Sequence, residues 1–162
     1  MKMTVFAFFA LILTFFGCAK PQVELSRAVT ASIKTPTMAL SQSGFINALP
    51  NDAYQLQTYA AGSGTMELTV SDRVCQGMLC LSAESFNSRY LSRYYPPNLL
   101  RDILGERTIA GLENSAIETA KNGFTQRAEA ADKYAIVYTK NGGELRFSDR
   151  LNRITIVIRD AN

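Results

Sequence analysis

The sequence predicts a single α+β domain built on a mainly antiparallel sheet. Near both ends of the chain apolar residues alternate with polar ones, which is the pattern of half-buried strands. In the middle they recur every three to four residues, the period of an amphipathic helix. This order favours two to three helices inserted between an N-terminal hairpin and a C-terminal β-meander. We expect the domain to span residues 23–162.

Three strands are predicted in the N-terminal part. Residues 23–33 alternate with one interruption, at Arg27. Residues 54–59 and 66–70 alternate on either side of a glycine-containing loop, which indicates a hairpin. Residues 35–51 hold two prolines and a glycine around an apolar patch, so we expect a loop with one short helical turn.

Three helices are predicted in the middle of the chain. Ser82 can cap the first, which continues to Tyr94 before a pair of prolines stops it. A short second helix covers residues 98–105. The third covers residues 108–122, where an Asn-Gly pair at its end is typical of a left-handed cap.

The C-terminal part is predicted to be a meander of three strands. Their cores are residues 134–138, 145–147 and 154–158, each with alternating large apolar side chains. A candidate fourth strand precedes them at residues 124–128.

Composition argues against several classes of function. The chain has 162 residues, no His and a formal net charge of +3. Without His, the usual general base, zinc ligand and nucleophile pairs are missing, and the small, dispersed charge does not indicate a nucleic-acid partner. We therefore expect no metal and no cofactor. Two carboxylate pairs, Glu113 with Glu118 and Asp149 with Asp160, keep a small envelope hydrolase as one alternative.

The N-terminus has the features of an export signal. Lys2 precedes an apolar run over residues 5–16, which is shorter than the roughly 20 residues needed to span a bilayer. The small residue Gly17 then stands directly before Cys18.

Gly17 and Cys18 resemble the lipobox of bacterial lipoproteins, although aromatic residues occupy the two positions before them. The resemblance implies that residues 1–17 are a signal peptide, that Cys18 becomes acylated, and that residues 18–22 form a lipidated tether. It also implies an outer-membrane location, because the inner-membrane retention residue Asp is replaced by Ala19. The alternatives are an ordinary secretory signal with a chance cysteine, or an uncleaved anchor.

The two remaining cysteines, Cys75 and Cys80, form an even pair. In an exported protein a disulfide is the expected state of such a pair. Their spacing excludes a C-x-x-C redox site, and two free buried thiols are the alternative.

Arginine and tyrosine concentrate in two segments, and both residue types are enriched in interfaces. On the predicted first helix Arg89 and Arg93 share a face, and the C-terminal meander has an excess of basic residues. The alternative for these segments is core tyrosines beside solvated arginines. The candidate partner-binding residues are Arg89, Arg93, Tyr94, Tyr95, Arg153 and Arg159.

These observations favour a non-catalytic outer-membrane lipoprotein that faces the periplasm. Its expected partners are the membrane, through the lipid anchor, and another envelope protein or a cell-wall or lipopolysaccharide component. The main alternative is a surface-exposed interaction factor, such as an adhesin or an enzyme inhibitor.

Overall fold

A computed structural model describes residues 22–161, so the predicted signal peptide, Cys18 and most of the tether lie outside the described residues. The described chain forms one antiparallel sheet of 11 strands with two short helices. The predicted α+β class is therefore wrong, and the fold is β-rich. The elements are β1 (Leu25–Lys34), β2 (Ala39–Leu49), β3 (Ala53–Ala60), β4 (Ser63–Val70), β5 (Arg73–Gln76), β6 (Leu79–Ser82), α1 (Ala83–Tyr90), α2 (Leu99–Leu104), β7 (Ser115–Ala120), β8 (Gly123–Ala130), β9 (Tyr134–Asn141), β10 (Glu144–Asp149) and β11 (Ile154–Asp160).

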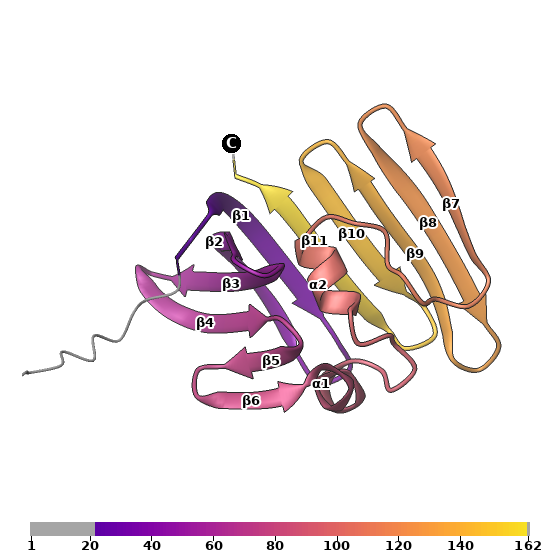
Figure 1. The fold of residues 1–162 in the computed structure, drawn as a ribbon, viewed down its shortest axis with the longest axis horizontal. Coiled ribbons are helices and arrows are strands. Elements are labelled where there is room, and N and C mark those ends of the chain that lie inside the picture. The colour runs from indigo at the N-terminus through magenta and orange to yellow at the C-terminus, as the bar shows by residue number, and fades with distance from the viewer. Residues whose placement is uncertain (1–21, 162) are drawn as a thin grey trace, which may run out of the picture.

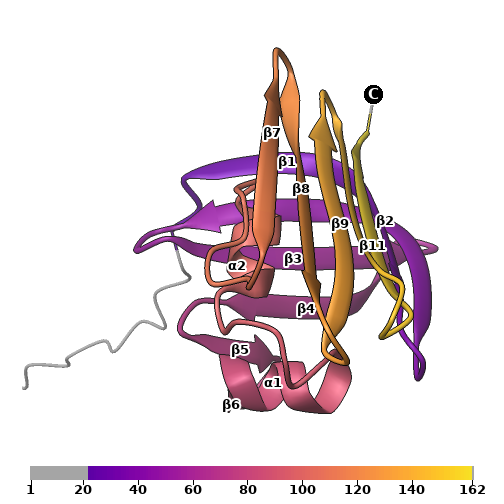
Figure 2. The same cartoon turned by 90° about the vertical axis from the view of Figure 1, so that its right-hand side faces the viewer.

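Two meanders make up the sheet. One contains β1 to β6, the other β7 to β11, and they join where β1 pairs with β11. In Figure 2 the strands of the two meanders cross steeply, so the sheet is strongly curved. The two helices follow the first meander in sequence, and α2 lies between the two halves in both views (Figures 1 and 2).

The core fills the concave side of this sheet. Strand residues at alternate positions point inward, and α2 contributes an almost wholly apolar surface. No helix within residues 22–161 is long and apolar enough to cross a bilayer. The most deeply buried apolar side chains include Val29, Val70, Leu99, Ile103, Tyr138, Leu145, Phe147, Ile154 and Ile158.

The segment predicted as a loop at residues 35–51 contains the longest strand, β2. Its glycine does not mark a loop. Gly44 lies opposite Thr58 of β3, and a Cβ atom at Gly44 would fall 1.9 Å from the carbonyl oxygen of Gln57. This glycine therefore permits a close approach between strands.

The third predicted helix does not form. Ile109 and Leu112 are buried in an irregular segment, and the residues after them form the edge strand β7. All of β7 is exposed, so no inward-facing alternation marks it as a strand. The Asn-Gly pair belongs to the hairpin that connects β7 with β8, because Ala120 pairs with Gly123.

The first two helices are confirmed, although the first is shorter than predicted. The Ser82 hydroxyl caps α1 by accepting a 3.2 Å hydrogen bond from the backbone N–H of Ser85. The helix ends at Tyr90, and the side-chain amide of Asn87 donates to the carbonyl of Pro96 over 2.9 Å. This contact folds the following segment back on the helix, which places Tyr95 in the core.

The predicted N-terminal hairpin and the C-terminal meander are confirmed. Strands β3 and β4 are joined by Ala61 and Gly62, which both have positive φ. Cys75 and Cys80 face each other across β5 and β6 and form a disulfide. Strands β8 to β11 include the candidate fourth strand.

Candidate functional site

The predicted partner-binding residues do not form one surface. Arg89, at the end of α1, is exposed. Arg93 and Tyr94 are also exposed but lie beyond the helix, so Arg89 and Arg93 do not share a helix face. The Arg93 guanidinium stacks over the Tyr94 ring at 4.9 Å and donates to its hydroxyl over 2.8 Å.

Tyr95 belongs to the core. Only 4% of its surface is exposed, and its hydroxyl donates to a carboxylate oxygen of Asp149 over 2.6 Å. Its ring packs edge-on against Phe147. Its side chain is therefore not available to a partner in this structure.

Arg153 and Arg159 lie at opposite ends of β11. Arg153 is in the turn before the strand, with φ of 54°, and Arg159 is near its end. The Arg159 guanidinium is already paired with Glu144 at 2.7 Å. Of these two arginines, Arg153 lies at the end of the β10–β11 hairpin that holds Asp149, and Arg159 lies at the other end.

The bond between Tyr95 and Asp149 brings two segments of the predicted set together. Arg93 and Tyr94 directly precede Tyr95, whereas Arg150 and Arg153 follow Asp149 in the turn between β10 and β11. We call Arg93, Tyr94, Arg150 and Arg153 the arginine end. Its three arginines have no carboxylate within ion-pair distance among the described residues.

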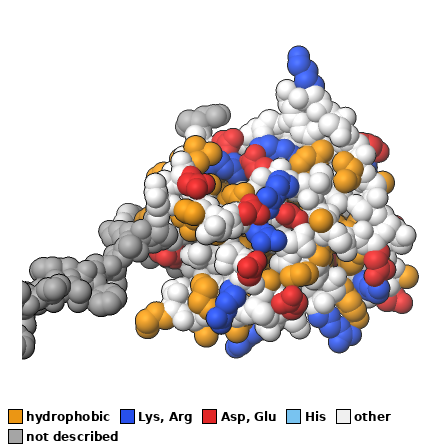
Figure 3. Space-filling model, in the orientation of Figure 1, with side chains coloured by type: hydrophobic (Ala, Val, Ile, Leu, Met, Phe, Trp, Pro, Cys, Tyr) orange, Lys and Arg blue, Asp and Glu red, His pale blue; other side chains and the backbone are white. Residues whose placement is uncertain are grey.

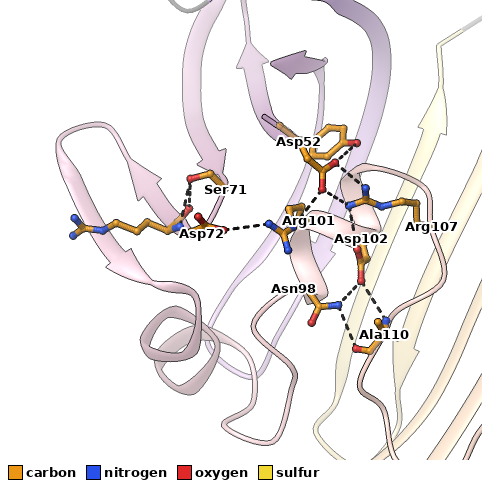
Figure 4. Close-up of polar contacts among 10 residues, drawn as sticks. Asp52, Ser71, Asp72, Asn98, Arg101, Asp102, Arg107 and Ala110 are labelled. Carbon is orange, nitrogen blue, oxygen red and sulfur yellow. Dashed lines mark hydrogen bonds and ion pairs between the residues drawn. The ribbon is translucent and has the colours of Figure 1, made fainter. Parts of the chain in front are cut away.

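A second polar site was not predicted from the sequence. On the face drawn in Figure 3, acidic and basic side chains alternate near the centre. They surround a cleft of about 510 Å³ between the turns after β2 and β4 and the two helices. We call it the polar cleft, and Figure 4 shows its contacts.

Arg107 is the central residue of the polar cleft. It donates two hydrogen bonds to Asp52, of 2.7 and 3.1 Å, and a third of 3.1 Å to Asp102 (Figure 4). Arg101 pairs with Asp72 at 3.3 Å. The hydrogen bond from Arg107 holds the pKa of Asp52 below its usual range, because this bond and the charge of Arg107 together exceed the opposing effect of desolvation.

Asp102 anchors the other side of the cleft. Its carboxylate accepts from the side chain of Asn98 and, over 3.3 Å, from the backbone N–H of Ala110. Asn98 in turn donates to the Ala110 carbonyl over 3.2 Å. The polar cleft therefore fastens the segment after α2 to that helix and to the turn at Asp52.

A third polar cluster surrounds Glu106, just after α2. Lys140 of β9 lies 2.5 Å from one carboxylate oxygen, and Arg27 of β1 lies 2.6 Å from the other without an aligned hydrogen bond. Because β1 and β9 belong to different meanders, Glu106 links both halves of the sheet to α2.

The charged side chains of the polar cleft and of the Glu106 cluster form ion pairs with one another. The two carboxylate pairs expected for a hydrolase do not converge. Asp149 and Asp160 lie at opposite ends of the β10–β11 hairpin, and Glu113 and Glu118 are paired separately with Lys133 and Arg127. Asp52 stays ionised at neutral pH, which is unsuitable for a general acid.

Signals for these clusters are weak in the sequence, because their members are far apart along the chain. Asp52 and Arg107 are separated by 55 residues. Asn51-Asp52 could have been recognised as a turn, and both residues do have positive φ, but a turn does not reveal its ion-pair partners. Comparison with protein-family models and with curated proteins gives no match.

Proposed function

We propose that this protein is a non-catalytic lipoprotein of the bacterial cell envelope. In this proposal Cys18 anchors it in the outer membrane, the domain faces the periplasm, and the arginine end binds an acidic envelope protein or an acidic cell-wall or lipopolysaccharide component. The observation that carries the binding role is the arginine end, where Arg93, Arg150 and Arg153 have no carboxylate partner within residues 22–161 while Tyr94 is exposed beside them.

The unpaired state of these arginines matters because most other arginines of the described chain are engaged. Arg27, Arg101, Arg107 and Arg159 all form ion pairs. A guanidinium without an internal partner can form a bidentate bond with a carboxylate or phosphate of another molecule. Exposed tyrosine supplies contact area with little loss of side-chain entropy.

The disulfide supports an exported location. A bond between Cys75 and Cys80 persists in oxidising compartments and is rare in the cytosol. The apolar run and Gly17-Cys18 add the resemblance to a lipoprotein signal.

The anchor is tested by metabolic labelling with a radioactive or clickable fatty acid. The wild-type protein should incorporate the label, and Cys18→Ser should not. Incorporation by Cys18→Ser would exclude lipidation at this residue. Proteolytic shaving of intact cells tests the orientation, since a periplasm-facing domain should survive and a surface-exposed one should be degraded.

The binding surface is tested with a photocrosslinking amino acid at Tyr94 in intact cells. We expect a crosslinked adduct that weakens at high salt and is lost when Arg93→Glu and Arg153→Glu are combined. Lys121→Glu is the matched control, because Lys121 is an exposed cation without an ion pair in the described part of the chain, and it lies in the β7–β8 turn at the opposite end of the sheet. Equal crosslinking in all three proteins would place the interface elsewhere.

A further inference from the structure

We infer that the cavity beneath α1 binds an aliphatic chain whose anionic head group is held by Arg89. This inference rests on the proposed function, since it names the chemistry of an envelope component that the protein would carry or contact. It uses a cavity and an arginine that are distinct from the arginine end.

The cavity is apolar and lies inside the curve of the sheet. Its volume is about 110 Å³, and its walls come from β1, β4, β11 and both helices. Protein interiors contain few voids larger than a water molecule, and apolar cavities of roughly 150 Å³ stay dry yet admit apolar molecules. Its walls include Ile33, Met66, Leu68, Phe86, Leu100 and Ile156.

The cavity opens to solvent at one side. Met38, which is 43% exposed, and Gln76, which is also exposed, belong to its lining. The flexible thioethers of Met38 and Met66 can adjust to chains of different shape. A chain entering here replaces solvent contact by contact with these apolar walls.

Apolar surface continues outside the opening. Directly after Gln76 the disulfide-closed hairpin presents Met78, which is fully exposed, and Leu79, which is 57% exposed. Because the cavity holds only a short length of chain, this hairpin offers contact for the part that remains outside. An extended aliphatic chain therefore fits this region better than a compact ligand.

Arg89 supplies the charge that selects the head group. Its guanidinium lies 5.4 Å from the centre of the Tyr90 ring, and Tyr90 is part of the cavity wall. Arg89 is exposed and has no carboxylate within ion-pair distance among residues 22–161. The acidic residue of α1, Glu84, lies in its first turn, at the other end of the helix. A carboxylate or phosphate next to the chain would complete the site.

The experiment uses the full chain in nanodiscs of uncharged lipid with two photoreactive probes. One is a diazirine derivative of dodecanoic acid, and the other is the corresponding dodecanol. Peptide mass spectrometry maps the crosslinks. We expect dodecanoic acid to label peptides that contain Met66 and Phe86, and excess unmodified laurate to compete with it.

Two variants distinguish the contribution of the aliphatic chain to binding from that of the anionic head group. Arg89→Glu should reduce labelling by the acid about tenfold, the factor that corresponds to about 1.4 kcal/mol, and leave dodecanol labelling unchanged. Lys121→Glu is the matched control, because it reverses an exposed cation that has no ion pair among residues 22–161 and belongs to no proposed site, and it should label like the wild type. Met66→Trp, which fills the cavity, should reduce labelling by both probes, with its melting curve as the folding check.

Several results would overturn the inference. They are labelling spread over the surface without enrichment at the cavity, equal loss in Arg89→Glu and Lys121→Glu, or an acid signal that Arg89→Glu does not change. These results leave the lipid labelling at Cys18 and the crosslinking at Tyr94 unaffected, so they would not count against the proposed function. Conversely, acyl incorporation by Cys18→Ser would exclude the anchor but not the cavity site.

Discussion

The hydroxyl of Tyr95 donates a 2.6 Å hydrogen bond to the carboxylate of Asp149, and both side chains are buried. Asp149 also accepts from the backbone N–H groups of Ala135, Leu151 and Asn152. Burial, and then the bond to Asp149, raises the pKa of Tyr95 far above its usual value, so the hydroxyl remains a donor. This single contact fixes the segment after α1 to the end of β10 and so positions the arginine end.

Replacing Tyr95 by Phe should destabilise the protein although it preserves the ring. A buried carboxylate would lose one donor, which costs about 1.5–3 kcal/mol of unfolding free energy. Urea unfolding measures the effect. Tyr94→Phe is the control, because that hydroxyl belongs to an exposed side chain and its loss should change stability by no more than about 0.5 kcal/mol. Equal stability of the two variants would contradict a structural role for Tyr95.

Gly44 and Gly64 are predicted to respond oppositely to replacement by Ala. At Gly44 the added carbon would collide with the backbone of Gln57, so β2 and β3 must separate, at a cost of about 3 kcal/mol. At Gly64 the nearest atom to an added Cβ lies 3.9 Å away on the Tyr59 ring, so the carbon fits. Because alanine lowers the backbone entropy of the unfolded chain, Gly64→Ala should stabilise the protein by about 0.5 kcal/mol. Thermal melting of both variants measures whether each change lowers or raises the stability of the protein. A tolerated Gly44→Ala would contradict the close strand approach.

Glu106 has a left-handed backbone, with φ of 55°, that usually favours glycine at a helix end. The backbone N–H of Arg107 donates to the carbonyl of Asp102 over 2.8 Å and that of Glu106 to Ile103 over 3.1 Å, which is a Schellman motif. We interpret the glutamate as retained at this position for its ion pairs with Arg27 and Lys140.

Glu106→Gly and Glu106→Ala should therefore differ although neither can form an ion pair. The glycine variant relieves the left-handed strain and should be more stable by about 1 kcal/mol. Glu106→Gln keeps the strain and removes the charge. Because salt screens the ion pairs of the wild type, the difference in unfolding free energy between this variant and the wild type should shrink as salt is added. Asp132 provides a control, because it has φ of 59° and no ion pair among the described residues, and its Gly and Ala variants should show the strain difference without the salt effect.

The alternation of apolar and polar residues predicted many strands of this sheet. It failed for strands whose formation depends on tertiary contacts. Alternation identified β3, β4 and β9 to β11, because each has one face in the core. Alternation could not identify β7, whose residues are all exposed at the edge of the sheet. There a chance spacing of apolar residues from Ile109 onward imitated a helix.

The candidate sites show the same limit. Local composition selected Arg93 and Arg153, but only the fold reveals that Tyr95 between them is a core residue. The polar cleft depends on contacts between residues far apart in sequence, such as Asp52 and Arg107. The pairing of β1 with β11, which joins the two meanders, likewise has no local signal.

The ion pair of Asp52 with Arg107 should make stability depend on acid pH. Because the folded pKa of Asp52 lies below its ordinary value of 3.8, the unfolded chain takes up a proton first as the pH falls. The contribution of Asp52 is therefore fully present above the unfolded pKa and is lost as the pH falls through the folded pKa. Since its side chain is 44% exposed, we expect less than about 1 kcal/mol.

Urea unfolding between about pH 2 and pH 6 measures this contribution, because that range brackets the carboxyl titrations. Asp52→Asn should flatten the acid limb of the stability curve. Arg107→Gln should flatten it similarly, since Arg107 is the main cause of the lowered pKa, and the double variant should lose little more than either single one. Glu144, whose pKa is lowered mainly by its hydrogen bond from Arg159, contributes to the same limb and stays intact in all three variants. An unchanged acid limb in Asp52→Asn would show that the ion pair at the centre of the polar cleft does not stabilise the folded state.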